Sequence, residues 1–152
     1  MKILLQRVKR ASVKVDNGII GDIDNGLLLF VGFTNGDNEN IIEQMAKKCV
    51  ELRIFSDENG KMNKSLLDIN GKILSISQFT LYANYLKGRR PSFENSLEPI
   101  LAEKYYEYFN DLLHNIYSID VQRGKFGADM QVELINDGPV TIMLDSDILI
   151  KK

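Results

Sequence analysis

The sequence predicts a mixed α+β fold, built as one domain over residues 1–152. Three observations support this prediction. A length of 152 residues suits one domain with one hydrophobic core. A hydrophobic fraction of 44% and a charged fraction of 26% are typical of globular proteins. Strand-like and helical segments also follow one another in the order strand block, helix, strand, helix, strand block.

The strands are predicted from short apolar or alternating runs that turn residues separate. Asn-Gly pairs, such as Asn17-Gly18 and Asn25-Gly26, favour the positive φ of hairpin turns. Residues 27–33 are so uniformly apolar that we expect this strand to be buried on both faces. The predicted strands are residues 3–8, 11–16, 27–33, 72–78, 118–123, 130–136 and 140–145.

Two helices are predicted from apolar residues at helical spacing. The first begins after Asn38 as its N-cap and carries Cys49 on its apolar stripe, so we interpret this cysteine as a core residue. The second is expected to open with Asn95 and Glu98 as a capping box, with His114 exposed in its last turn. Its predicted apolar face consists of Leu97, Leu101, Tyr105, Tyr108 and Leu112.

Composition excludes several classes of function. With one cysteine and one histidine, the chain cannot form an internal disulfide, and most zinc sites and Ser-His-Asp triads are excluded, so we expect neither a metal nor a cofactor. A net charge of −2 argues against a protein that coats duplex nucleic acid. No apolar run approaches the roughly 20 residues that span a bilayer. We therefore expect a cytoplasmic protein without a membrane anchor.

Three polar segments interrupt the strand pattern. Residues 77–82 close an apolar strand, residues 124–130 join two strands, and residues 136–141 break a strand pair. In the last segment Pro139 cannot donate to a strand ladder, and Gly138 lets the backbone approach another group closely. The residues alone allow two interpretations of these segments. They are either simple turns or parts of a site at a strand end lined by Ser, Gln and Thr.

Short segments spread along nearly the whole chain match the motifs of one known family. They are Gln6 to Val8, Ala11 to Val13, Leu52 to Phe55, Gly60 to Asn63, Ser77 to Tyr82, Gly88 to Phe93, Gly127 to Met130 and Asn136 to Thr141. Through these segments the chain resembles the D-aminoacyl-tRNA deacylases, a family that removes wrongly attached D-amino acids from tRNA. Within them, Ser77-Gln78-Phe79-Thr80-Leu81 matches the D-specific branch, whereas a related branch carries Pro-Gln-Ala-Thr-Leu there. The resemblance implies the three-layer β/α/β fold of that family.

The resemblance implies a homodimer in which a cis Gly138-Pro139 peptide enters the active site of the partner subunit. There it would act as a chiral screen that excludes L side chains. Achiral glycine would pass the screen, so glycyl-tRNA mischarged on alanine tRNA is also an expected substrate.

The resemblance also implies the site residues. Ser77, Gln78, Phe79 and Thr80 form the expected catalytic segment, in which backbone N–H groups near Phe79 and Thr80 stabilise an oxyanion and the substrate's own 2′-hydroxyl assists. We expect Lys87, Arg89 and Arg90 to contact phosphates of the acceptor end, and Phe126 and Met130 to pack against the terminal adenine. Two alternatives stay open: a generic acyl hydrolase with Thr80 as nucleophile, and a non-catalytic module that binds the tRNA end.

Overall fold

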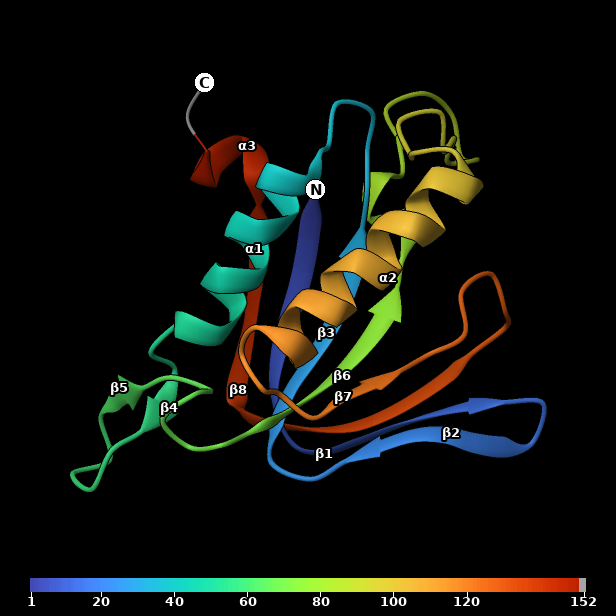
Figure 1. Ribbon diagram of the computed structural model, residues 1–152. Coiled ribbons are helices and arrows are strands. Elements are labelled where there is room, and N and C mark those ends of the chain that lie inside the picture. Colours follow the sequence, from blue (N-terminus) through green and yellow to red (C-terminus); the bar gives the residue numbers. More distant parts are fainter. Residues whose placement is uncertain (151–152) are drawn as a thin grey trace.

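The computed structural model describes residues 1–150, and it confirms the α+β class (Figure 1). Residues 151 and 152 of the predicted domain lie outside the described residues. The elements are β1 (Lys2–Val15), β2 (Gly18–Ile23), β3 (Gly26–Gly32), α1 (Glu39–Glu51), β4 (Phe55–Ser56), β5 (Met62–Lys64), β6 (Lys72–Ser77), the 3₁₀ turn η1 (Phe79–Tyr82), α2 (Pro99–Asn115), β7 (Val121–Arg123), β8 (Gln131–Asp145) and α3 (Ser146–Leu149).

The main sheet is mixed and has the strand order β2-β1-β3-β6-β7, with β8 paired to β1. The pairs β3–β6 and β6–β7 are parallel, and β1 is antiparallel to each of its three partners. Val31 of β3 lies opposite Ser77 of β6. The carboxyl ends of two parallel strands therefore meet at one edge of the sheet, which is where open sheets of this kind place ligand sites.

In two places, a pair of separately predicted strands forms a single continuous strand in the structure. β1 joins the segments predicted as 3–8 and 11–16, because the polar pair Lys9-Arg10 passes through a register shift rather than a turn. β8 likewise joins 130–136 and 140–145. Opposite β1, however, Gln6 pairs with Thr141 and Val8 pairs with Asn136. Residues 137–140 therefore bulge out of the ladder beside Arg7.

The prediction of α1 is confirmed. The Asn38 side chain accepts a hydrogen bond from the Ile41 amide at 3.1 Å, as an N-cap does. Cys49 is fully buried, and burial raises the pKa of its thiol to about 12. The interpretation of Cys49 as a core residue rather than a reactive thiol is thus confirmed.

The prediction of α2 was wrong in two details. Its N-cap is Glu98 rather than Asn95, and the Glu98 carboxylate accepts from the amides of Ile100 and Leu101. The fully buried stripe of α2 is also shifted by one residue from the predicted stripe. The residues of the predicted stripe lie along the edge of the buried one and are only half-buried. His114 is exposed as expected, with Nδ1 3.2 Å from the Ile119 carbonyl. The buried residues of α2 are Ala102, Tyr106, Phe109, Asn110 and Leu113.

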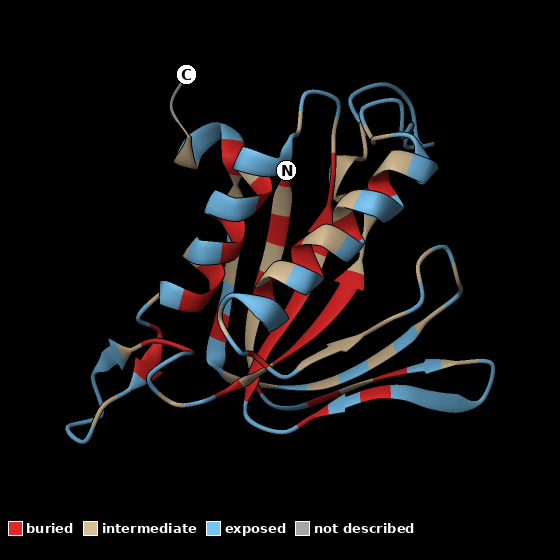
Figure 2. Ribbon diagram, in the orientation of Figure 1, coloured by how far each residue is buried: buried red, intermediate tan, exposed pale blue. Residues whose placement is uncertain are grey.

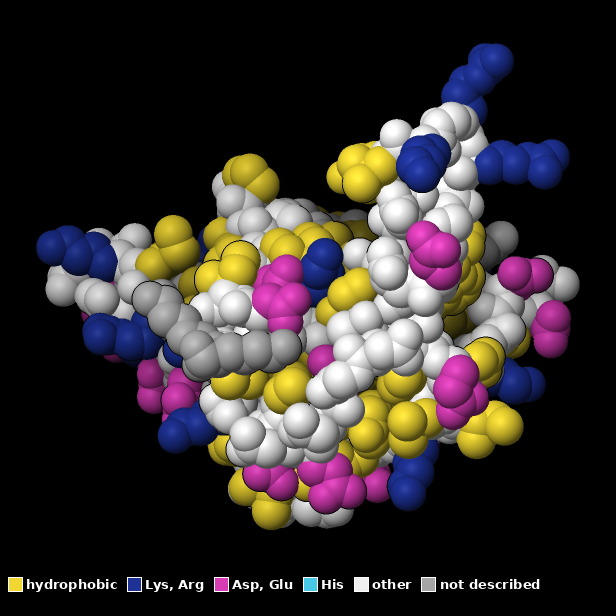
Figure 3. Space-filling view, turned by 90° about the horizontal axis from the view of Figure 1, so that it is seen from above, with side chains coloured by type: hydrophobic (Ala, Val, Ile, Leu, Met, Phe, Trp, Pro, Cys, Tyr) yellow, Lys and Arg dark blue, Asp and Glu magenta, His cyan; other side chains and the backbone are white. Residues whose placement is uncertain are grey.

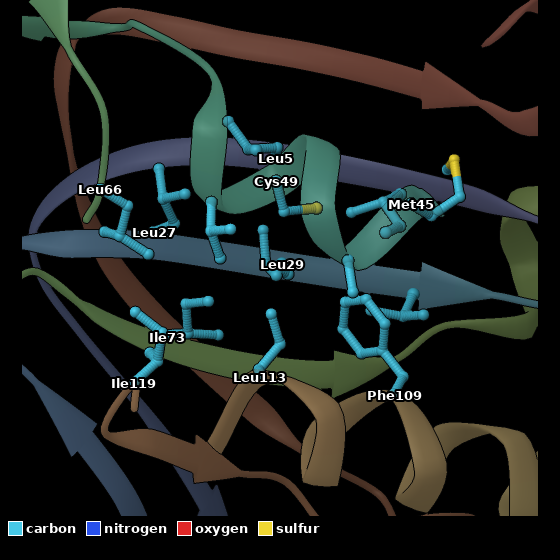
Figure 4. Close-up of a cluster of buried hydrophobic side chains, with 14 of the residues drawn as sticks. Leu5, Leu27, Leu29, Met45, Cys49, Leu66, Ile73, Phe109, Leu113 and Ile119 are labelled. Carbon is cyan, nitrogen blue, oxygen red and sulfur yellow. The ribbon is translucent and has the colours of Figure 1, made fainter. Parts of the chain in front are cut away.

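Two apolar clusters lie on opposite faces of the central strands. The larger one fills the space between the sheet and the helices α1 and α2, whose buried sides face the strands (Figure 2). In it Leu27 and Leu29 of β3 meet Cys49 of α1 and Leu113 of α2 (Figure 4). The smaller cluster contains Leu28 and is completed by the outer parts of β1, β2 and β8. The prediction that β3 is buried on both faces is therefore confirmed.

The predicted elements do not include β2, the short hairpin of β4 and β5, or α3. β2 exposes Ile19 and Ile20, so its pattern does not alternate as a half-buried strand does. Within residues 1–150, no helix is both long enough and apolar enough to cross a bilayer.

Candidate functional site

An open pocket of about 400 Å³ lies at the carboxyl ends of β3 and β6. Four pieces of chain form its wall: the end of β3, the end of β6 with the start of η1, the segment that leads into α2, and the loop after β7. The lining residues are Val31, Gly32, Phe33, Ser77, Gln78, Phe79, Phe93, Ser96, Leu97, Glu98, Pro99, Ala102, Phe126 and Gly127. Most of these side chains are apolar, and a few polar groups converge among them, as is usual in ligand sites.

Backbone contacts hold the pocket wall together. The Gln78 amide donates to the Val31 carbonyl at 2.7 Å, and the Leu97 amide donates to the Phe33 carbonyl at 3.0 Å. Gly32 permits the first of these contacts, because a Cβ at this position would lie 2.7 Å from the Gln78 carbonyl oxygen. The close packing of two strand ends therefore requires glycine at residue 32.

The expected catalytic segment lies in part on the pocket wall. Ser77, Gln78 and Phe79 line the pocket, whereas Thr80 is exposed beside it. The Thr80 hydroxyl accepts a hydrogen bond from the Gln78 side-chain amide at 2.5 Å. An amide cannot take a proton from a hydroxyl, so this contact does not activate Thr80 as a nucleophile.

Two backbone amides remain available at this wall. Phe79 and Thr80 are the first two residues of η1, where N–H groups have no partner within the turn. Neither amide donates a hydrogen bond to another residue in the described range 1–150. Two adjacent unpaired donors beside a pocket are suited to bind a carbonyl oxygen or an oxyanion.

Aromatic rings form the remainder of the wall. Phe79 contacts Phe93 edge to face, with ring centroids 5.0 Å apart. Phe126 lines the pocket, and its ring packs against the buried ring of Tyr106 with the two ring centroids 6.1 Å apart. Met130, which sequence analysis placed with Phe126, does not line the pocket and packs against the smaller apolar cluster.

The Gly138-Pro139 segment lies in the bulge of β8 and does not line this pocket. Its peptide bond is cis and both residues are exposed. Arg7, whose side chain is 11% exposed, holds the bulge by donating to the carbonyls of Asp137 and Ile54. The side chain of Asn136 also spans the bulge. Its Oδ1 accepts a hydrogen bond from the backbone N–H of Val140, and its Nδ2 donates to the Val140 carbonyl. The segment is thus an exposed, well-anchored projection.

The three expected phosphate contacts, Lys87, Arg89 and Arg90, lie on the exposed loop between η1 and α2. Asn84 and Ser92 close this loop with two backbone hydrogen bonds of 2.8 Å. Within the part of the chain that the structure describes, none of the three cations forms an ion pair. The view onto this end of the molecule shows Lys and Arg side chains on a projection (Figure 3).

Sequence reasoning missed the part of the pocket that precedes α2. Ser96 donates from its hydroxyl to the Phe79 carbonyl at 3.0 Å, and Glu98 is the one ionisable side chain among the lining residues. The carboxylate of Glu98 caps α2, which explains its position. This segment lies next to residue 77 because of the order of the parallel strands. A single sequence does not reveal that strand order. Across residues 1–150, no three His, Cys, Asp or Glu side chains form a group that would hold a metal ion.

A family model and a curated relative both match this chain as deacylases of aminoacyl-tRNA. A family model described as D-Tyr-tRNA(Tyr) deacylase matches residues 4–145. A D-aminoacyl-tRNA deacylase of Thermosipho africanus (strain TCF52B) is 53% identical over 146 residues, which cover 96% of this chain and 97% of the relative.

Two solved structures share the fold. One, described as the c-Myc DNA Unwinding Element Binding Protein, is 42% identical with a TM-score of 0.91, and the match covers 95% of this chain and 98% of that one. The other, described as a probable eukaryotic D-amino acid tRNA deacylase, is 16% identical with a TM-score of 0.81, covering 94% and 97% of the two chains. The family model and the curated relative each span nearly the whole chain, and the chain therefore belongs to the D-aminoacyl-tRNA deacylase family of tRNA editing hydrolases.

Proposed function

We propose that residues 1–152 act as one domain in a cytoplasmic homodimer, which hydrolyses the ester of D-aminoacyl-tRNA in the pocket at the ends of β3 and β6. The products are the free D-amino acid and tRNA. One observation carries the proposal: Ser77-Gln78-Phe79, part of the segment on which the family resemblance rests, forms one wall of a pocket of about 400 Å³.

The hydrolysis requires little acid–base machinery from the protein. Water adds to the ester carbonyl carbon, the bond from that carbon to the ribose oxygen breaks, and the ribose oxygen takes up a proton. The neighbouring 2′-hydroxyl of the substrate lies within reach of both oxygens and assists the proton transfer. The amides of Phe79 and Thr80 stabilise the negative charge that develops on the carbonyl oxygen, an interaction for which one donor is typically worth about 3 kcal/mol.

Ser77 and Gln78 hold the substrate in this arrangement. Both are half-buried and line the pocket, so their hydroxyl and amide groups can bond the ribose and the α-amino group. Phe126 supplies an apolar face for the terminal adenine. Holding ester, hydroxyl and water in one geometry lowers the barrier by several kcal/mol, because the loss of their free motion has already occurred on binding.

Chirality is selected by exclusion. Gly138-Pro139 is exposed and anchored, and it lies outside the pocket of its own chain, so it is available to a second copy. Placed against the substrate α-carbon, its backbone leaves space for hydrogen or a D side chain and collides with an L side chain. Mischarged glycyl-tRNA, which has no side chain, is accepted for the same reason.

The two alternative functions make different demands. A generic acyl hydrolase with Thr80 as nucleophile needs a base beside the Thr80 hydroxyl, where Gln78 lies instead. A non-catalytic module that binds the tRNA end needs no organised oxyanion donors.

Incubation with D-tyrosyl-tRNA, L-tyrosyl-tRNA and glycyl-tRNA separates these functions. We expect rapid release of D-tyrosine and glycine, with L-tyrosyl-tRNA decaying at its uncatalysed rate. Equal release of both tyrosine enantiomers would support the generic hydrolase, and binding without release would support the non-catalytic module.

A further inference from the structure

The loop of residues 84–92, here called the basic arm, carries features that the proposed chemistry does not use. Tyr85 is 76% exposed and Leu86 is 85% exposed, although both are large apolar side chains. Three cations follow within the next four residues, and the arm contains no Asp or Glu. A large exposed aromatic ring among unpaired cations is the usual composition of a surface that binds single-stranded nucleic acid.

The basic arm has a defined shape. Its base is closed by the two hydrogen bonds between Asn84 and Ser92, and the Asn84 side chain accepts from the Leu86 amide at 3.1 Å. The same side chain donates to the carboxylate of Glu94, two residues beyond the arm, at 3.3 Å. Gly88 has φ +72°, the left-handed conformation that turns the chain at the tip.

The basic arm also begins and ends at the pocket. η1, which contributes Phe79 to the pocket wall, precedes it, and Phe93, another lining residue, follows it directly. The edge-to-face contact of Phe79 with Phe93 joins the two sides below the arm. The arm therefore stands next to the pocket, at the end of the molecule where α2 begins (Figure 1).

We propose that the basic arm holds the unpaired 3′ end of the tRNA, with the Tyr85 ring stacked on a nucleobase and Leu86 covering an adjoining base or ribose. This proposal rests on the proposed function, which places the ester, and with it the tRNA 3′ end, in the pocket that the arm adjoins. Fully extended, residues 84–88 would span at most about 13 Å, which is about the length of four stacked nucleotides of one strand. Stacking needs bases that are not paired, so the arm distinguishes the single-stranded end from the duplex stem.

The test uses two uncharged acceptor minihelices, one with and one without the unpaired 3′ end. Tyr85→Ala is expected to weaken binding of the first about tenfold, the usual loss for one stacked base, and to leave binding of the second unchanged. Tyr85→Phe, which retains the ring, should bind as the wild type does. Ile116→Ala is the matched control, since Ile116 is also exposed, at 67%, but lies just after the far end of α2.

Salt dependence tests the cations separately. Replacing Lys87, Arg89 and Arg90 with Ser is expected to reduce the slope of log affinity against log salt by about 2, as three lost phosphate contacts on a single strand predict. Equal affinity of Tyr85→Ala and wild type for the minihelix with the 3′ end would overturn the proposal. So would a change in sedimentation of Tyr85→Ala, because the arm would then contact a second copy of the chain.

A truncated substrate separates failure of this proposal from failure of the proposed function. D-tyrosyl-adenosine carries the ester without the preceding nucleotides, so wild type and Tyr85→Ala should hydrolyse it at the same rate. If wild type hydrolyses no D-ester but the arm still binds the 3′ end, the proposed function fails and the arm proposal stands. If hydrolysis proceeds and Tyr85→Ala binds every RNA normally, the arm proposal alone fails.

Discussion

Thr80 is the residue at which two mechanisms make opposite predictions. Its hydroxyl accepts a hydrogen bond from the side-chain amide of Gln78, and Thr80 does not line the pocket. In the mechanism assisted by the substrate, only the Thr80 backbone amide takes part. We therefore expect Thr80→Ala to retain deacylation of D-tyrosyl-tRNA to within about tenfold, because the loss of a neutral hydrogen bond costs about 1 kcal/mol. Single-turnover kinetics with labelled D-tyrosine measures this rate.

The control for this variant is Thr80→Ser, which retains a hydroxyl. If Thr80 is a covalent nucleophile, Ser retains much of the activity while Ala falls to the uncatalysed rate. That pattern would replace the mechanism proposed here with the acyl-enzyme alternative.

Gly32 tests the position of the Gln78 backbone. An alanine Cβ at residue 32 would lie 2.7 Å from the Gln78 carbonyl oxygen, so the strand end that carries the proposed catalytic segment must move. We expect Gly32→Ala to lower kcat for D-tyrosyl-tRNA by tenfold to a hundredfold, because displacements of about 1 Å at a reacting centre have effects of this size. Steady-state kinetics gives kcat, and thermal unfolding shows whether the variant is folded.

Gly18→Ala is the matched glycine control. At Gly18 the nearest atom to an added Cβ is 3.8 Å away, which is ordinary contact distance. Its activity should equal that of the wild type. Wild-type activity in Gly32→Ala as well would show that the position of Gln78 has no influence on the reaction.

At the scale of single elements, Arg7 links β1 to the bulge of β8. Its guanidinium donates to two carbonyls in different directions, those of Asp137 and Ile54, which the single ammonium of lysine cannot reproduce. We expect Arg7→Lys to loosen the Gly138-Pro139 segment without changing the pocket. Hydrolysis of L-tyrosyl-tRNA should then rise at least tenfold, while hydrolysis of D-tyrosyl-tRNA stays within a few fold. The ratio of the two kcat/KM values measures the loss of selectivity.

Arg10→Lys serves as the control on the same strand. Arg10 pairs with Glu133 on the surface, with both side chains more than half exposed, and such pairs contribute little. The control should retain full selectivity. Unchanged selectivity in Arg7→Lys would mean that the bulge does not depend on Arg7.

The two helices show where sequence patterns suffice. α1 has one apolar stripe and one good N-cap, so its start and its buried face follow from the sequence. α2 has doubled apolar pairs, Tyr105-Tyr106 and Leu112-Leu113, which allow two adjacent stripes. Contact with both the sheet and α1 decides between the stripes: Tyr106 bonds the Ser75 carbonyl of β6, while Tyr108 bonds Glu43 of α1. This choice depends on tertiary packing, which no local pattern contains.

Over the whole molecule, the candidate site was predictable only as separate pieces. The motif at residues 77–80 and the Gly138-Pro139 segment are visible in the sequence, and the family resemblance assigns a role to each. The alignment of β3 with β6, and hence the contribution of the segment before α2, comes from long-range strand pairing. A different long-range pairing, that of β8 with β1, places Gly138-Pro139 in a bulge that does not line the pocket.

This separation leads to a prediction about pairs of chains. A Gly138→Ala chain has an intact pocket, but an added Cβ would lie 2.7 Å from the Val140 amide nitrogen and distort the proposed screen. A Gln78→Ala chain has an intact screen and a defective pocket. We expect the Gly138→Ala homodimer to hydrolyse both D- and L-tyrosyl-tRNA, and the Gln78→Ala homodimer to hydrolyse neither at a significant rate.

Coexpression of the two chains with different tags yields the mixed dimer for kinetic analysis. If the screen acts across the dimer, the one functional pocket of the mixed dimer faces the intact screen of the Gln78→Ala chain. Its activity toward L-tyrosyl-tRNA should then be lost, while its activity toward D-tyrosyl-tRNA per functional pocket is retained. If the screen instead acts on the pocket of its own chain, the functional pocket of the mixed dimer still carries the distorted segment. Its activity toward L-tyrosyl-tRNA, per functional pocket, should then equal that of the Gly138→Ala homodimer.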